Sequence, residues 1–313
     1  MEIIHISAEC YPIAKVGGLA DVVGALPKYQ NKAGKKTAVV MPYYNTKFTQ
    51  NKSFRLDHRN TVSLGSLLYD FEVIQLESDE LGYPLYLIKI PGLMDRENVY
   101  GYNDDTERFM AFQKAVLIWI LQFKDKPQIV HCHDYHTGLI PFMMTYAHQF
   151  EVLKEIPTIL TIHNAQYQGQ FSFDKLNYFP EYDLSYSGML EWEQMINPLA
   201  AAVKCSWAVT TVSPSYLIEL RSVANGLEWL LDNEKGKSTG ILNGIDTDVW
   251  NPATDPMISK NFTKQTSLSG KRNNKIFLCD KFDLNPEKPL FAFIGRLVGE
   301  KGAELLPHIF DAI

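Results

Sequence analysis

Short apolar segments recur along the chain and alternate with longer amphipathic ones. Most of the short segments lack polar alternation, as is typical of strands buried on both faces of a parallel sheet. They cover residues 3–7, 37–41, 128–132, 157–162, 208–212, 240–242 and 290–294. Between them, residues 105–124 carry apolar side chains at helical spacing, from Phe109 to Phe123, and residues 191–207 repeat that pattern.

This alternation predicts an α/β fold. Strands joined through helices form right-handed β-α-β units, so we expect a Rossmann-like, doubly wound and mostly parallel sheet. Residues 61–90 depart from the rhythm, because segments 71–76 and 84–90 indicate antiparallel strands joined near Gly82. We expect a small antiparallel hairpin there, as an insertion or at the edge of the sheet.

The polarity of the chain changes beyond residue 250. Residues 251–274 are polar and carry Pro252 and Pro256, which predicts a linker or surface loop. A strand, a turn and a helix are indicated from Pro289 onward, but one strand and one helix cannot bury a core. We therefore expect a complete domain over 1–250, a linker over 251–288 and the truncated start of a second domain over 289–313.

Composition narrows the class of protein. Hydrophobic residues make up 46% and charged residues 21% of the 313, which is typical of a globular chain. No segment reaches the roughly 18 apolar residues of a membrane span, and the first residues carry no basic region of a secretory signal. Four scattered cysteines favour a reducing, cytoplasmic setting. The net charge of −6 disfavours nucleic acid as a partner.

A glycine pair follows the first predicted strand. Gly17 and Gly18 precede a predicted helix, where backbone amides and the positive end of the helix dipole suit a phosphate group. Lys15 adds a full positive charge. The alternative is an ordinary glycine turn with an exposed lysine, and the spacing does not decide between them. The segment does not match the Gly-x-Gly-x-x-Gly fingerprint of dinucleotide-binding proteins, which disfavours a nicotinamide dehydrogenase.

The segment Lys15-Val16-Gly17-Gly18-Leu19-Ala20-Asp21-Val22 closely resembles a motif of bacterial glycogen synthases and plant starch synthases. Four further segments resemble motifs of the same family, in the same order. They are His131-Cys132-His133-Asp134-Tyr135-His136, Thr161-Ile162-His163-Asn164 with Tyr167-Gln168-Gly169, Asn243-Gly244-Ile245-Asp246 with Trp250-Asn251-Pro252, and Gly295-Arg296-Leu297 with Lys301-Gly302. Tyr135 replaces the tryptophan that is usual at its position, so a sugar contact there would differ.

The resemblance implies the GT-B arrangement of two Rossmann-like domains across a cleft, with this chain as the N-terminal, acceptor-side part. It implies transfer of glucose from ADP-glucose to the non-reducing end of an α-1,4-glucan, with retention of configuration and without a metal or other cofactor. The acidic donor-site motif of the family would lie further on, so we expect the chain to be inactive alone. The sequence leaves open UDP-glucose as donor, the oligomeric state, and two other functions: a sucrose- or trehalose-type transferase and a non-catalytic glucan-binding module.

The family motifs also imply roles for individual residues. The implied catalytic residues are Lys15, His163, Arg296 and Lys301. The implied substrate-binding residues are Gly17, Gly18, Asp21, Asp134, His136, Asn164, Tyr167 and Asn243.

Elementary chemistry agrees with these roles, but it also allows a purely structural role for each of these residues. Cations would stabilise the negative charge that grows on a departing phosphate, but Arg296 and Lys301 can equally be solvated charges on a turn. His163 ends a predicted strand, where ligands bind in such sheets, although a buried core histidine is the alternative. Asp21 can simply complement the helix dipole.

A metal site is the alternative for the segment 131–136. His131 and His133 point the same way along a strand, and Asp134 and His136 follow. Three imidazoles and a carboxylate could bind zinc or iron. No further ligand set supports this, so we expect no metal and interpret the segment as a wall of the substrate cleft.

Overall fold

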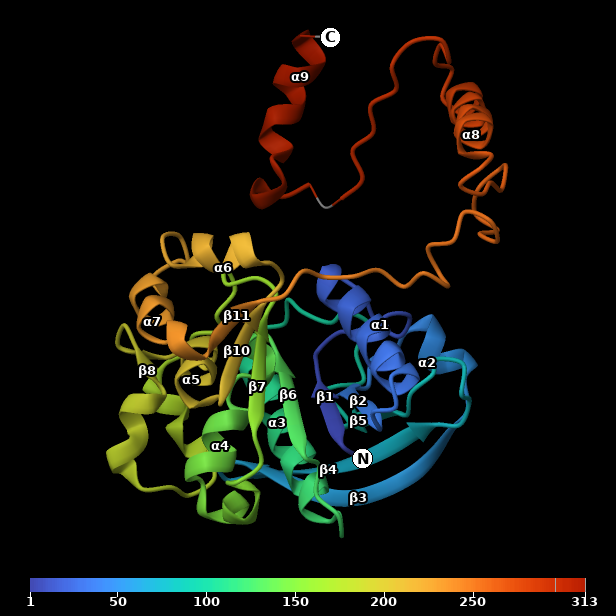
Figure 1. Ribbon diagram of the computed structural model, residues 1–313. Coiled ribbons are helices and arrows are strands. Elements are labelled where there is room, and N and C mark those ends of the chain that lie inside the picture. Colours follow the sequence, from blue (N-terminus) through green and yellow to red (C-terminus); the bar gives the residue numbers. More distant parts are fainter. Residues whose placement is uncertain (296, 313) are drawn as a thin grey trace. The chain divides into compact units, whose positions relative to one another are not determined.

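The computed structural model describes residues 1–295 and 297–312 (Figure 1). The chain divides into two compact units, Met1–Ile245 and Asp246–Ile313, and each is described by itself.

The first unit is built on one large sheet. Within the described residues it has nine strands in the order β11-β10-β7-β6-β1-β2-β5-β4-β3. The strands are β1 Ile3–Ile6, β2 Thr37–Pro42, β3 Phe54–Leu64, β4 Leu67–Leu76, β5 Leu85–Lys89, β6 Ile129–His133, β7 Thr158–Ile162, β10 Ala208–Thr211 and β11 Ser238–Gly240. Pairing is parallel from β11 to β5 and antiparallel among β5, β4 and β3. The expected mostly parallel α/β fold is confirmed.

The antiparallel region is larger than predicted. Strands β4 and β5 pair as expected, with Glu72 opposite Lys89. The sequence pattern did not indicate β3, which pairs with β4 across a turn at Gly65. Most of β3 is exposed and polar, so it lacks the apolar signal of the buried strands. Because β5 pairs in parallel with β2, these strands form one end of the main sheet.

Helices cover both faces of the sheet (Figure 1). They are α1 Gly18–Lys32, α2 Lys47–Asn51, α3 Asp105–Leu121, α4 Ile140–Tyr146, α5 Pro198–Cys205, α6 Pro214–Leu220 and α7 Glu228–Asn233. The 3-10 helices are η1 Tyr135–Thr137, η2 His148–Leu153, η3 Phe173–Tyr178, η4 Leu184–Met189 and η5 Lys235–Lys237. The prediction of a helix over 105–124 is confirmed by α3, whose residues 108–120 are all buried.

The predicted helix over 191–207 is only partly correct. Residues Glu191–Trp192 (β8) and Met195–Ile196 (β9) pair as a small antiparallel hairpin. Its turn residues, Glu193 and Gln194, have positive φ angles of 52° and 65°, which a helix does not allow. The helix starts later, at Pro198, where the Asn197 side chain accepts a hydrogen bond from the amide of Ala200.

The side chains of the central strands alternate between two cores. Ile4, Ile6, Val130 and Cys132 belong to the larger core, which includes α3. The smaller core gathers around Leu19 and Val23 of α1. Successive strand residues point to opposite faces of a sheet, so the residues between these apolar positions face away from the larger core. Those residues are His5, His131 and His133.

The second unit contains α8 Ser267–Lys281, η6 Gly299–Lys301, η7 Ala303–Leu305 and α9 Leu306–Ala312. Part of the expected loop is therefore helical, and Asn274 of α8 exchanges hydrogen bonds with the backbone of Lys260. The predicted strand over 290–294 is wrong, because in the described part of this unit no second strand is present to pair with it. Within the described residues, no helix is both long and apolar enough to span a membrane.

Close packing between η1 and α5 predicts a sensitive glycine. A Cβ added at Gly138 would lie 2.4 Å from the carbonyl oxygen of Pro198, and backbone atoms cannot move aside as a side chain can. We expect Gly138→Ala to lower the free energy of unfolding by about 1–3 kcal/mol. Gly188→Ala is the matched control, since its Cβ would meet no atom within 4 Å. Urea unfolding measures both, and equal stability of the two variants would contradict the packing argument.

Candidate active site

The residues expected to carry chemistry in the first unit follow the strands of the parallel sheet. The glycine pair follows β1, Asp134 follows β6, His163 follows β7 and Asn243 follows β11. Parallel strands end at the same edge of a sheet, so these segments meet there. The candidate site is therefore the carboxyl edge of β1, β6, β7 and β10–β11.

The glycine pair opens α1. Gly17 is the cap residue and Gly18 the first residue of the helix. A Cβ at either position would meet no atom within 4 Å, so the protein's own packing does not require glycine here. That open space is what close approach of a ligand to the backbone would need.

A buried carboxylate already holds part of this loop. Glu9 is 4% exposed, and its Oε2 accepts hydrogen bonds from the amides of Val16 at 2.6 Å and Gly17 at 3.0 Å. Its Oε1 accepts a third from the Tyr100 hydroxyl at 2.7 Å. The Gly17 amide is therefore occupied, although Gly17 was expected to contact substrate. The sequence reasoning missed Glu9, whose only signal is a lone acid in a mostly apolar segment.

Lys15 and Asp21 are paired with each other. The Lys15 ammonium lies 2.8 Å from the Asp21 carboxylate, and their side chains are 43% and 44% exposed. Exposed pairs of this kind contribute little to stability, so the pair is held weakly enough to exchange partners. The ammonium also lies 5.6 Å from the centre of the Tyr11 ring.

Asp134 joins the ends of two strands. Its Oδ1 accepts hydrogen bonds from the amides of His163 at 2.7 Å and Asn164 at 3.4 Å, and its own φ is 55°. Loss of hydration on burial raises the pKa of Asp134 to about 7, although the two amide hydrogen bonds oppose that shift. The carboxylate therefore fixes the backbone that carries His163.

His136 is enclosed by aromatic rings. Its ring stacks on Tyr100 at 4.6 Å between centroids, lies 3.7 Å from the Tyr135 ring and contacts the edge of Phe109 at 4.8 Å. Burial lowers its pKa to about 3. The side chain is 5% exposed, so it supports the surrounding loops more directly than it reaches solvent.

The imidazoles do not gather as the metal alternative required. Asp134 and His136 lie apart from the cluster, and His5 joins it: the ring nitrogens of His5, His131 and His133 lie within 4.8 Å of one another. The rings of His131 and His133 are stacked, with centroids 4.4 Å apart and planes 18° apart. A metal ion binds imidazole in the plane of the ring. The in-plane lone pairs of two stacked rings point in nearly the same direction rather than toward one point, so the geometry of His131 and His133 disfavours a shared ion.

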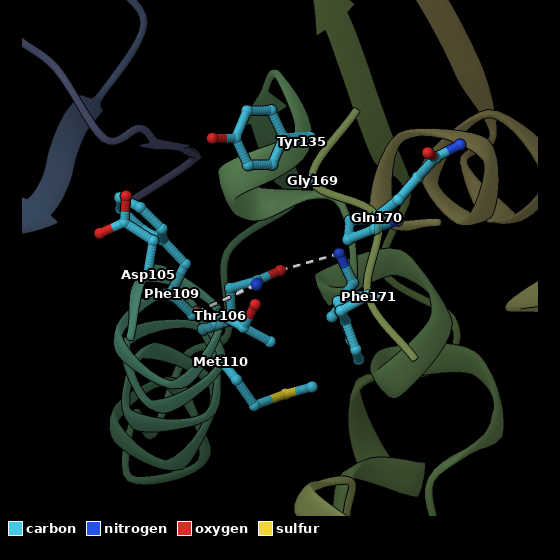
Figure 2. Close-up of a pocket in the computed structure, with 11 residues that line it drawn as sticks. Asp105, Thr106, Phe109, Met110, Tyr135, Gly169, Gln170 and Phe171 are labelled. Carbon is cyan, nitrogen blue, oxygen red and sulfur yellow. Dashed lines mark hydrogen bonds between the residues drawn. The ribbon is translucent and has the colours of Figure 1, made fainter. Parts of the chain in front are cut away.

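Two cavities flank this edge of the sheet. One, of about 210 Å³, lies between the start of α3 and the loop 169–171 (Figure 2). Asp105, Thr106, Phe109 and Met110 line one side of it. Tyr135 closes it, and a Cβ on Gly169 would lie 2.1 Å from that ring. The second, of about 270 Å³, is lined by His131, His133, Thr161 and Asn243 among others.

The remaining expected residues are dispersed. Tyr167 is 45% exposed, and Asn164 accepts a hydrogen bond from the Gln166 amide. Lys301 belongs to the second unit, where it is exposed at the end of η6. Arg296 lies outside the described residues. The structure thus brings Lys15, Asp21 and the glycine pair together at the start of α1, and Asp134 together with His163.

Comparison with known proteins identifies similar chains. The family described as "Starch synthase catalytic domain" matches residues 2–233. Glycogen synthase of Flavobacterium johnsoniae is 57% identical over 308 residues, which is 98% of this chain and 65% of that protein. Glycogen synthase of Streptococcus agalactiae serotype III is 36% identical over 328 residues, covering 99% of this chain and 66% of that protein.

Among solved structures, the chain is similar to the catalytic domain of starch synthase IV from Arabidopsis thaliana bound to ADP and acarbose. The TM-score is 0.88 at 33% sequence identity, over 99% of this chain and 66% of that one. The chain thus spans about two thirds of the length of these relatives, and 65% of the Flavobacterium protein.

The buried imidazoles predict a stability that falls in acid. Burial lowers the pKa of His5 and His163 to about 4 and that of His136 to about 3, whereas the unfolded chain has imidazole pKa values of about 6.5. Between these values the unfolded chain binds protons that the folded chain does not. Each such group therefore lowers the free energy of unfolding by about 1.4 kcal/mol per pH unit as the pH falls from 6.5. The raised pKa of Asp134 increases the free energy of unfolding as the pH falls, but this one group is outweighed by the several imidazoles.

Urea unfolding at pH 7.5, 6 and 5 measures this dependence. We expect His136→Phe to make the free energy of unfolding less dependent on pH, by the amount that corresponds to about one proton, since one buried imidazole is removed. His148→Phe is the control, because this side chain is exposed and its replacement removes no buried imidazole. A free energy of unfolding that stays level or rises toward pH 5 contradicts the prediction.

Proposed function

The chain belongs to the family of starch synthase catalytic domains, and on that basis we propose that it forms the acceptor-side part of a retaining glucosyltransferase. The reaction is transfer of glucose from ADP-glucose to the non-reducing end of an α-1,4-glucan. Within this proposal, residues 1–250 form the acceptor-side domain, 251–288 the linker and 289–313 the start of the donor-binding domain. The ligands bound to the Arabidopsis relative, ADP and acarbose, agree with a nucleotide and a glucan as substrates.

One observation carries the proposal: an open glycine pair at a helix start lies beside an exposed lysine, at the edge of the sheet where His163 also lies. Departure of a nucleoside diphosphate builds negative charge on the leaving phosphate. A nearby ammonium and unpaired amides stabilise that charge most when it is largest, in the transition state. We assign this role to Lys15 and the Gly18 end of α1, since the Gly17 amide is already bound by Glu9.

Asp21 keeps this cation in place before substrate arrives. Its carboxylate holds the Lys15 ammonium beside the start of α1. In the proposed reaction the ammonium exchanges this partner for phosphate, and the released carboxylate accepts a hydrogen bond from a hydroxyl of the acceptor sugar. By the family motif, Arg296 and Lys301 are assigned to the same reaction as further sources of positive charge.

His163 is assigned to the transferred glucose. A neutral imidazole can orient sugar hydroxyls, and its low pKa of about 4 keeps it neutral at physiological pH. Asp134 acts through the backbone of His163 and is a positioning residue, as is the enclosed His136. Asn164, Tyr167 and Asn243 complete the proposed sugar contacts.

The full-length protein tests the reaction. We expect it to lengthen a maltooligosaccharide with ADP-glucose, to form only α-linkages by NMR, and to remain active in excess EDTA. UDP-glucose serves as the competing donor. Glucan affinity without transfer from either donor would replace the proposal with a binding module, and transfer to fructose or glucose phosphate would replace it with another transferase.

Removal of the Lys15 charge tests the mechanism. We expect Lys15→Ala to lower kcat by on the order of a hundredfold, because one preorganised charge at the leaving group is lost. Lys124→Ala, at an exposed lysine after α3, is the control and should retain full activity. Turnover of Lys15→Ala equal to that of the control would rule out the assigned role.

A further inference from the structure

A continuous line of side-chain hydrogen bonds crosses the sheet and ends on His163. Gln30 Oε1 on α1 lies 2.8 Å from His5 Nε2 on β1. His5 Nδ1 lies 2.9 Å from His133 Nε2 on β6. His133 Nδ1 lies 3.0 Å from His163 Nε2, just after β7. Four side chains, from α1, β1, β6 and the loop after β7, are thus joined in series.

Each imidazole in the middle of this line uses both of its ring nitrogens. A neutral imidazole carries one N–H donor and one acceptor nitrogen, so a proton fixed at one end dictates every position that follows. Loss of hydration lowers the pKa of His5 to about 4 and holds that of His133 well below its usual value, so both are neutral at pH 7. The line therefore has only two self-consistent arrangements of its protons. In one, every hydrogen bond donates toward Gln30, and in the other every hydrogen bond donates toward His163.

Gln30 selects between these two states. Its carbonyl oxygen can only accept, so His5 carries its proton on Nε2 and accepts at Nδ1. His133 then donates from Nε2 to His5 and accepts at Nδ1. His163 in turn donates from Nε2 to His133, which leaves its Nδ1 without a proton.

We propose that Gln30, His5 and His133 are positioning residues that set the neutral tautomer of His163, with the proton on Nε2 and an acceptor lone pair on Nδ1. The value of this for catalysis rests on the proposed function: an acceptor at Nδ1 receives a hydrogen bond from a sugar hydroxyl, whereas the reversed state would present a donor.

The neighbouring His131 is not part of this line of hydrogen bonds. Its Nε2 lies 2.6 Å from the Thr161 hydroxyl, which lies 2.6 Å from the Thr210 hydroxyl, and Thr210 donates to the Leu160 carbonyl. The His131 ring stacks on that of His133 and lies tilted against that of His5, but its side-chain hydrogen bonds belong to this separate series. Within the described residues, the hydrogen-bonded series that contains His131 thus ends on the Leu160 carbonyl, whereas the series through His5 and His133 ends on His163.

Nitrogen NMR reads the tautomers directly. In full-length protein labelled with ¹⁵N-histidine at pH 7.5, the two-bond ¹H–¹⁵N correlation pattern distinguishes a proton on Nε2 from one on Nδ1. The signals of His163 are identified as those that disappear from the spectrum of the His163→Gln variant. We expect His5, His133 and His163 all to carry the proton on Nε2. A His163 proton on Nδ1, or a doubly protonated ring, overturns the proposal without need of a variant.

Substitution of Gln30 tests the control of the tautomer. Gln30→Met keeps the size of the side chain but removes the acceptor, so both directions become accessible. We expect the His163 nitrogen shifts to move toward a mixture of tautomers, and kcat/KM to fall about twofold, because roughly half of the molecules carry the wrong tautomer. Gln75→Met, at an equally half-buried glutamine that binds Arg55 on the β3–β4 hairpin, is the matched control.

Unchanged His163 tautomers in Gln30→Met overturn the proposal, as do equal shifts in the Gln75→Met control. The tautomers are read without substrate, so this result is independent of the proposed function. If the protein showed the expected tautomers but no transferase activity, the proposal about the line of hydrogen bonds would hold and only the proposed reaction would be wrong.

Discussion

Parallel pairing of β6 with its two neighbours is the constraint on which the site depends. Its register places His131 beside His5 of β1 and His133 beside Thr161 of β7. The same pairing brings the ends of β6 and β7 together, so that Asp134 reaches the amide of His163. A shift of one residue would turn the histidines into the larger core and separate the two loops.

Burial then makes hydrogen bonding obligatory around this edge. A buried polar group without a partner costs free energy, and both buried carboxylates at this edge, Glu9 and Asp134, are matched by hydrogen bonds. Glu9 and Asp134 solve the problem in the same way, by accepting bonds from two successive amides of a neighbouring loop. Each carboxylate thereby fixes a loop that carries a candidate catalytic residue, Lys15 in one case and His163 in the other.

The buried and the exposed parts of the candidate site differ in the functions they suit. The histidine line, the Asp134 clamp and the enclosed His136 are buried, which keeps their geometry constant and their imidazoles neutral. The Lys15–Asp21 pair and the Gly18 end of α1 are exposed, with space for a ligand beside the glycines. In the proposed reaction, the charged leaving group arrives at the open part and the transferred sugar is oriented by the rigid part.

The sequence alone determined the α/β class, most of the buried parallel strands and the segments at their ends, because apolar periodicity and glycine-rich junctions are local properties. It did not indicate β3, whose polar residues pair only because β4 lies beside them, and it extended a helix over the β8–β9 hairpin. The roles of Glu9, His5 and Gln30 were decided by the tertiary structure, since their partners lie up to 128 residues away in the chain. Which ring nitrogen faces which partner follows from strand register and helix position, and no local pattern of residues encodes it.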